Sequence, residues 1–271
     1  MKKTAGIMIC MGVFAFGTCA ADTQTPNKFD VSPEIYYVSY KQPGTQKERG
    51  VMYGTNLCYT YRGWLTESDP YINRNMFRAD ARAVLGLVDQ KTVSSGIIRN
   101  VRDYAFEFRA IWGYNLVRLK TPTIVPYIGG GYRYLSDDTS ERSSNWDING
   151  YERESFYFYS PAGVELSATT KNGWIVTANA EYDHLWRGIQ KNKMSANPGY
   201  YNMTMNQNKG AGARVSLNLR KQFKAIDLGL EPFIRYWCIQ RSDTKTDPAG
   251  RGWAEKKNTT SELGIKLTVG F

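Results

Sequence analysis

From Ile35 to the C-terminus, the sequence is organised in segments in which apolar and polar residues alternate. A period of two is typical of β-strands, whose successive side chains point to opposite faces of a sheet. Each segment has about ten residues or slightly more, the length that a tilted strand needs to cross a bilayer. Ten such segments can be recognised, over residues 35–42, 51–62, 76–88, 101–115, 123–135, 155–169, 173–186, 211–221, 226–240 and 261–271.

The two rows of each predicted strand differ in charge. In residues 76–88, Phe77 and Leu85 share one row, whereas Arg78 and Asp80 belong to the other. Because charged residues are almost confined to one row, that row must line a lumen and the apolar row must face lipid. A soluble β-sandwich would instead pack its apolar row inside. The sequence therefore predicts an all-β fold, a closed antiparallel up-and-down transmembrane β-barrel of about ten strands, with eight or twelve as alternatives.

Connection lengths provide an independent check on this topology. The connections over 136–154, 187–210 and 241–260 are long, whereas those over 171–172 and 222–224 are short. Bacterial barrels have long extracellular loops and short periplasmic turns, so a periplasmic N-terminus and an even strand count fit this pattern. A short first loop and a long connection over 66–75 are exceptions, and the first two strands are therefore the least well defined.

The N-terminus has the features of a secretory signal peptide. Lys2 and Lys3 are followed by an apolar stretch over 7–16 and then by small residues. That stretch is too short for an anchor helix, and the residues before Cys19 do not favour the other alternative, a lipoprotein. We expect cleavage after Ala20 or Ala21. Residues 1–21 are then the signal peptide, and residues 22–271 form one barrel domain in the cell outer membrane.

Composition fits this location. Aromatic residues make up 14% of the chain, as suits a barrel with two interfacial girdles. The net charge of +10 could indicate nucleic-acid binding, but an exported protein does not meet nucleic acid. The expected partners are outer-membrane lipid and the anionic headgroups of lipopolysaccharide. Alternatively, the excess charge only keeps exposed loops soluble.

Two cysteines, Cys58 and Cys238, remain after the predicted processing. Because the predicted strands place them on non-adjacent strands with opposite facing, we expect free, buried thiols. Two cysteines and one histidine provide no metal-ligand cluster, so we expect no metal and no cofactor.

Three prolines, Pro126, Pro161 and Pro232, lie inside predicted strands. A closed barrel has no free edge where a missing N–H would be tolerated. We therefore expect these prolines at strand ends or bulges.

Four stretches resemble a known group of proteins: "TSELGIKLTVGF", "PYIGGGYRYLSDD", "EYDHLWRGIQK" and "EPFIRYW". They are similar to the outer-membrane β-barrels related to the opacity and OmpA-like porins, and the resemblance runs over residues 126–271. It implies fold and location but no substrate, because that group has no assigned chemistry. The last strand resembles the C-terminal signature of such barrels, with Phe271 as the assembly signal that the barrel-assembly machinery reads.

The row that is predicted to face the lumen carries charges of both signs. Such charges could form a conduit or a carboxylate-based site, or an ion-pair network that fills the barrel. The nearly balanced signs favour the filled barrel. The predicted lumen charge network comprises Arg78, Asp80, Arg82, Asp103, Glu107, Arg109, Arg133, Glu165, Glu181, Asp183, Arg214, Arg220, Glu231, Arg235, Glu262 and Lys266.

His184, the only histidine, is the main candidate for chemistry. Lipid A deacylases share a His-x-Ser pair, but here the second residue after His184 is Trp186. Omptin-type proteases share Asp-x-Asp and Asp-x-His motifs, whereas Asp183 and His184 are adjacent and must point to opposite faces. We therefore interpret His184 as an interfacial residue beside Trp186 and expect no catalytic residues.

The predicted extracellular loops are polar and basic. Arg187, Lys191 and Lys193 follow the seventh strand, and Lys245, Arg251, Lys256 and Lys257 surround Trp253 after the ninth. Basic residues around an aromatic ring could bind a glycan, lipopolysaccharide or a host surface, or could form simple solvated loops.

Two functions remain open from the sequence. The first is a non-enzymatic outer-membrane barrel, either a filled structural or surface-interaction protein or a narrow porin-like pore. The second is an outer-membrane enzyme, lipid A-modifying or protease-like, that uses His184 and the lumen carboxylates. The missing nucleophile–base pair favours the first.

Overall fold

The computed structural model describes residues 27–63, 75–116, 122–140, 142–195, 197–223 and 226–271. The predicted signal peptide and most of the connection over 66–75 lie outside these ranges. The long strands are β1 (Asn27–Gln42), β2 (Gln46–Arg62), β3 (Asn75–Thr92), β4 (Gly96–Tyr114), β5 (Thr123–Asp138), β6 (Glu152–Thr169), β7 (Trp174–Lys193), β9 (Gly210–Gln222), β10 (Asp227–Ile239) and β13 (Asn258–Gly270). The short strands are β8 (Met203–Asn206), β11 (Lys245–Thr246) and β12 (Gly252–Trp253).

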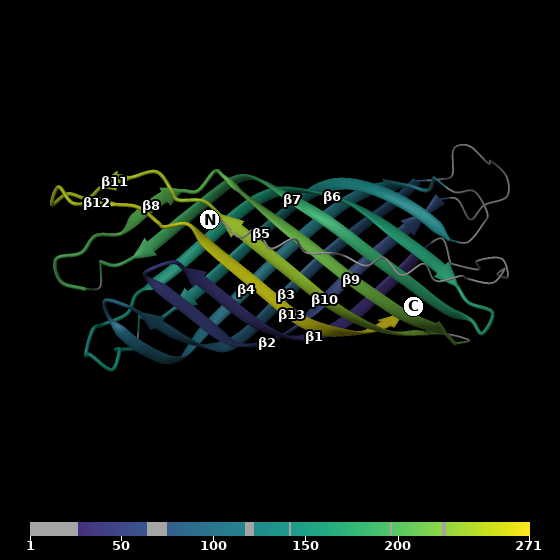
Figure 1. Ribbon diagram of the computed structural model, residues 1–271, viewed down its shortest axis with the longest axis horizontal. Helices are drawn as coiled ribbons and strands as arrows, with labels where there is room; N and C mark the ends of the chain where they lie inside the picture. Colours follow the sequence, from purple (N-terminus) through teal and green to yellow (C-terminus); the bar gives the residue numbers. More distant parts are fainter. Residues whose placement is uncertain (1–26, 64–74, 117–121, 141, 196, 224–225) are drawn as a thin grey trace, which may run out of the picture.

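The ten long strands form one closed barrel (Figure 1). Each pairs antiparallel with its neighbour in the chain, and β1 pairs with β13 to close the circle. At this seam Phe29 and Phe271 exchange both of their backbone hydrogen bonds, with N–O distances of 3.2 and 2.9 Å. The predicted fold class and strand number are therefore confirmed.

The outer surface carries the apolar row. Tyr53, Leu85, Ile234 and Leu263 are each more than half exposed, although they lie in the middle of long strands. The part of the chain that the structure describes contains no helix able to span a membrane.

The two ends of the barrel differ. The connections over 139–151, 194–209 and 240–257 are long and share one end, which we name the loop end. The opposite end, the turn end, has the short connections over 170–173 and 223–226 and the paired ends of β1 and β13. This arrangement agrees with the parity of long and short connections in the sequence.

Most strands reach further toward the loop end than predicted. β7 was expected to end at Trp186, but it continues to Lys193. A bulge opposite Phe158 and Tyr159 leaves Trp186 and Arg187 both exposed, and beyond it the inward row changes from odd to even positions. β3 and β4 likewise continue past a register shift between Val88 and Gln90. Because a bulge interrupts the alternation, the pattern stops before the strand does.

Each proline predicted to disturb a strand lies where pairing to one neighbour is interrupted. The β5–β6 ladder skips Pro161, the β9–β10 ladder skips Pro232, and the β4–β5 ladder ends next to Pro126. The β1–β13 ladder likewise skips Pro33 of β1. Each proline keeps its pairing to the other neighbour, so the barrel remains closed.

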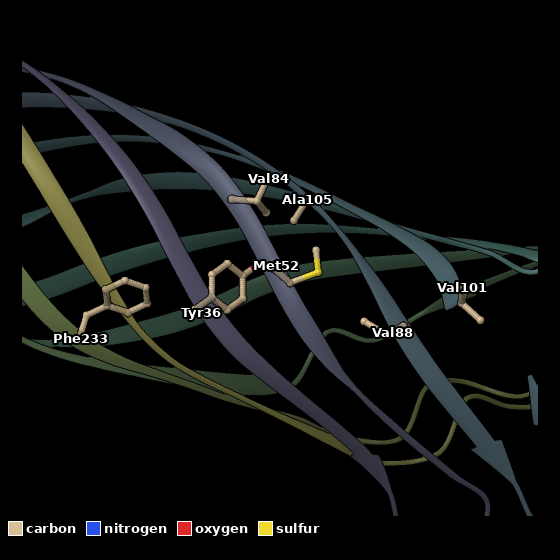
Figure 2. Close-up of a cluster of buried hydrophobic side chains, with 7 residues drawn as sticks. All are labelled: Tyr36, Met52, Val84, Val88, Val101, Ala105 and Phe233. Atoms are coloured by element: carbon tan, nitrogen blue, oxygen red, sulfur yellow. The ribbon is translucent and has the colours of Figure 1, made fainter. Parts of the chain in front are cut away.

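The alternation of polar and apolar residues suggests a uniformly polar inner surface. The inner surface in fact also carries apolar residues. An apolar cluster of Tyr36, Met52, Val84, Val88, Val101, Ala105 and Phe233 lies inside the barrel (Figure 2). Gly264 is packed against it, because a Cβ there would overlap Tyr36 and the backbone of Ile35. The lumen is thus filled by rings and methyl groups as well as by charges.

Candidate functional site in the barrel lumen

The sixteen residues of the predicted lumen charge network all lie on the inner face. Fifteen of them line the cavities inside the barrel, and Asp183 is fully buried against Arg214. The structure groups them into three tiers: a layer across the middle of the lumen and one set of charges toward each end.

One half of the middle tier joins five strands. Glu34 of β1 accepts hydrogen bonds from Arg82 of β3 at 2.5 Å and from Arg235 of β10 at 3.0 Å. Glu262 of β13 is 3.1 Å from Arg235 and 2.6 Å from Arg133 of β5. Arg235 and Glu262 are directly opposite in the β10–β13 register, which brings their side chains together.

The other half centres on Arg214 of β9. Its guanidinium lies 2.5 Å from Glu107 of β4 and 2.7 Å from Asp183 of β7. Glu181, two positions before Asp183, pairs with Arg109 at 2.5 Å. Arg82 lies 3.7 Å from Glu107 and so connects the two halves.

We name these ten residues the central layer. Its formal charge is zero, because it contains five arginines and five carboxylates. Tyr159 donates a further hydrogen bond to Glu107 at 2.6 Å, and Trp237 lies against Arg133 and Arg214. Buried charges are tolerated only when they are paired and hydrogen-bonded. Every member of this layer makes at least one ion pair, and five of its buried side-chain atoms have no hydrogen-bond partner among the described residues. Its members are Glu34, Arg82, Glu107, Arg109, Arg133, Glu181, Asp183, Arg214, Arg235 and Glu262.

A polar cavity of about 190 Å³ lies between the central layer and the turn end. Most of its charges are also paired, whereas Asp80 has no ion pair among the described residues. Arg62 and Arg78 both contact Glu165 at 2.7 Å, and Lys266 contacts Glu231 at 2.7 Å. Arg220 binds Asp30 through both terminal nitrogens, each at 2.9 Å. These contacts position the charges of seven strands around the cavity.

The loop end of the lumen has fewer cations. Arg153 contacts Glu48 at 2.6 Å and Asp137 at 2.8 Å. Asp103 faces Asp137 directly across β4 and β5. One buried carboxylate oxygen of each aspartate has no hydrogen-bond partner in the part of the chain that the structure describes. This tier therefore contains more acidic than basic side chains, unlike the central layer.

Several lumen charges were absent from the predicted network. Glu34 was missed because the facing of the first strand was ambiguous when it was read from Ile35 onward. Read from Asp30, the strand alternates, with Asp30, Ser32 and Glu34 inward. Arg62 was on the predicted polar row but outside the network. Glu48, Asp137 and Arg153 lie in strand ends beyond the predicted boundaries.

His184 lies outside the barrel. Its ring packs edge-on against Trp186 with a centroid distance of 4.4 Å, whereas Asp183 points inward. The barrel wall therefore separates His184 from every lumen carboxylate. No group of three or more potential metal ligands occurs among the residues that the structure describes.

Cys58 and Cys238 are free thiols, as predicted. They are half-buried rather than fully buried, which corrects the expectation. Cys58 lines the cavity at the turn end, and Cys238 shares the outward row of β10 with Ile234 and Tyr236.

The aromatic and basic residues of the third long loop bind one another. The Trp253 indole N–H donates to Asp247 at 2.9 Å, and the Arg251 guanidinium donates to the same carboxylate at 2.7 Å. Arg251 also lies over the ring of Tyr200. Although desolvation opposes it, these hydrogen bonds lower the pKa of Asp247 to about 2. These contacts hold Trp253 and Arg251 against Asp247 within the loop.

The comparison with solved structures bears on the architecture. No family model and no curated protein matches the sequence. The outer-membrane protease OmpT of Escherichia coli is similar in structure, with a TM-score of 0.56 and 10% identity over 91% of this chain and 98% of that chain. The translocator domain of the autotransporter NalP from Neisseria meningitidis has a TM-score of 0.41 and 12% identity over 90% and 88%. The likeness to OmpT shows that this chain has the fold of an outer-membrane β-barrel.

Proposed function

We propose that this protein is a non-enzymatic outer-membrane barrel with a structural or surface-interaction role, and that its central layer closes the lumen. The supporting observation is the neutral set of ten charges, nine of them buried, which come from β1, β3, β4, β5, β7, β9, β10 and β13. An ion that crossed this layer would have to displace pairs with distances of 2.5–3.7 Å. Small barrels have interiors just wide enough for side chains to fill.

The location belongs to this proposal. The lipid-facing apolar row, the long connections at one end and the N-terminal signal-like residues support export and insertion into the outer membrane. The loop end would then be extracellular. Kinship with the opacity and OmpA-like porin group rests on the sequence motifs alone.

A narrow pore is the alternative within the same class. The paired charges of the turn-end cavity are compatible with water, but the central layer lies between that cavity and the loop end. An enzyme that used His184 with lumen carboxylates has no support from the geometry, since the two lie on opposite sides of the wall.

Single-channel recording in planar bilayers tests the closed lumen. We expect the refolded wild type to insert without a stable open conductance. The double variant Glu34→Ala with Arg235→Ala removes one ion pair from the central layer without changing net charge, and we expect it to conduct. The matched control, Glu231→Ala with Lys266→Ala, removes an ion pair of similar length from the turn-end cavity and should stay closed. A steady, ion-selective conductance of the wild type would make the protein a porin.

A further inference from the structure

Three lysines lie side by side on the outer surface at the loop end. Lys41 of β1 is directly opposite Lys47 of β2, and Lys47 is directly opposite Lys91 of β3. All three are exposed and share the outward row with the lipid-facing residues. We name Lys41, Lys47 and Lys91 the lysine row.

No acidic residue faces these lysines directly, because the nearest acid on the same outward row, Asp89 of β3, lies directly opposite Arg49 of β2. None of the three lysines has an ion-pair partner among the described residues. The residues opposite its two ends are Thr259 of β13 and Ile97 of β4, which are uncharged. Like charges directly opposite one another in adjacent strands are destabilising, so the bare protein bears a cost here.

The opposite wall shows that this is not a general property of the loop end. There, Lys193 of β7 is directly opposite Glu152 of β6 and contacts it at 2.9 Å. Lys193 also lies 3.2 Å from Glu154, and Lys191 is directly opposite that residue. On the outer surface, Lys191 and Lys193 of β7 therefore lie opposite or contact acidic residues, whereas Lys41, Lys47 and Lys91 lie opposite lysines or uncharged residues.

The depth of the row can be placed from the strand geometry. On β2 the outward row from Val51 to Tyr61 is uncharged. Ten residues at ~3.3 Å each, tilted by roughly 40°, cover about 25 Å along the membrane normal, the usual height of the apolar band. Lys47 lies four positions beyond Val51, or about 10 Å above that band. This is the depth of the lipid headgroups, and lysine side chains can bend toward them.

We propose that the lysine row binds the phosphate groups of the anionic lipid in the outer leaflet, a phosphorylated lipid of the lipid A type. Three ammonium groups at adjacent strand positions match a headgroup that carries more than one phosphate, and such a partner removes the repulsion between them. The apolar residues below the row, such as Tyr37 and Val51, contact the acyl chains of the same molecule. This inference requires the outer-membrane location but not a closed lumen, so conductance results do not affect it.

Native mass spectrometry of the refolded full chain in neutral detergent tests the proposal. The probe is bisphosphorylated lipid A, with its enzymatically dephosphorylated form as a second probe. We expect the wild type to retain the phosphorylated lipid. The triple variant Lys41→Gln, Lys47→Gln, Lys91→Gln should bind it roughly 100-fold more weakly, since each lysine near an anionic surface contributes about a factor of five.

A second triple variant controls for net charge. Lys191→Gln, Lys193→Gln and Lys245→Gln remove the same charge at the same end, from lysines that lie opposite or contact acidic residues. This variant should bind like the wild type. Equal binding by the lysine-row variant, an equal loss in the control, or equal retention of the dephosphorylated lipid would each overturn the proposal. Heat-modified gel mobility identifies the folded samples, and Lys47→Gln alone replaces the triple variant if that variant does not fold.

Discussion

Opposite charges face one another in the central layer, whereas like charges face one another in the lysine row. In both places the register between neighbouring strands determines which residues face each other. Inside the barrel, Arg235 faces Glu262, and opposite signs alternate through the layer. Outside, Lys47 lies between two further lysines. A buried charge must find its partner within the chain, because no solvent or lipid reaches it. An exposed charge at headgroup depth can remain unpaired in the protein, since its partner is outside.

The largest expected effect concerns the interior. Arg235→Ala leaves Glu34 and Glu262 with fewer cations and gives the central layer a net negative charge. We expect the free energy of unfolding to fall by about 3–5 kcal/mol. Urea titration in detergent measures it. Arg99→Ala, an exposed arginine without an ion pair among the described residues, should change it by less than about 0.5 kcal/mol. A loss below about 1 kcal/mol for Arg235→Ala would mean that the layer is well hydrated.

The packing around the charges gives the next largest effect. Gly264→Ala places a methyl group against Tyr36 and Phe233, and we expect a destabilisation of about 1–3 kcal/mol in the same titration. Gly130→Ala is the matched control, because a Cβ there meets no atom within 4 Å. Equal stabilities for the two variants would show that the side chains of the apolar cluster can move to admit the methyl group and that the interior is loosely packed.

A smaller effect of opposite sign is expected outside. Lys47→Glu places an acid between Lys41 and Lys91 and converts two repulsive contacts into attractive ones. In neutral detergent this should stabilise the barrel by about 0.5–1 kcal/mol, and Lys47→Gln by less. If Lys47→Glu were destabilising, other groups of the protein would already neutralise the positive charge of the lysine row. The row would then not be a free binding site for lipid phosphate.

The smallest effect belongs to the third long loop. The pKa of Asp247, at about 2, is below its ordinary value, so its contribution to loop order is complete above pH ~4 and is lost as the pH falls toward 2. The NMR signal of the Trp253 indole N–H should therefore stay constant from pH 7 to about 4 and shift only below about 3. Asp247→Asn provides the spectrum without the charged acceptor. A midpoint near pH 4 would show that Asp247 is not held by Trp253 and Arg251.

Alternation of residue types was sufficient to predict the barrel because the membrane imposes it on every spanning strand. It predicted the inward facing of Glu107, Arg214 and Glu262 for the same reason. It could not give the partners of these residues, since pairing depends on register between strands. Arg235 thus contacts Glu34, more than two hundred positions away in the chain, rather than Glu231 on its own strand.

The protruding parts of the barrel were harder to predict. Beyond the bilayer both faces of a strand can be polar, so Glu152 and Arg153 give no alternation. A bulge such as that at Trp186 exchanges the inward and outward rows of the strand. The alternation in the sequence then breaks at the bulge, although the strand itself continues. The acidic tier at the loop end was missed because Glu48, Asp137 and Arg153 lie in these extensions.

The seam between β1 and β13 sets an order of events in folding. It joins residues such as Ser32 and Thr268, which are 236 positions apart, whereas every other ladder between long strands joins chain neighbours. Contacts with such large separation carry the greatest loop-closure cost and form late. Until then, Arg235 of β10 lacks its contact with Glu34 of β1, whereas Arg82 of β3 lies on the same side of the seam as Glu34. Closure of the seam is therefore the step that completes the ion pairs of the central layer.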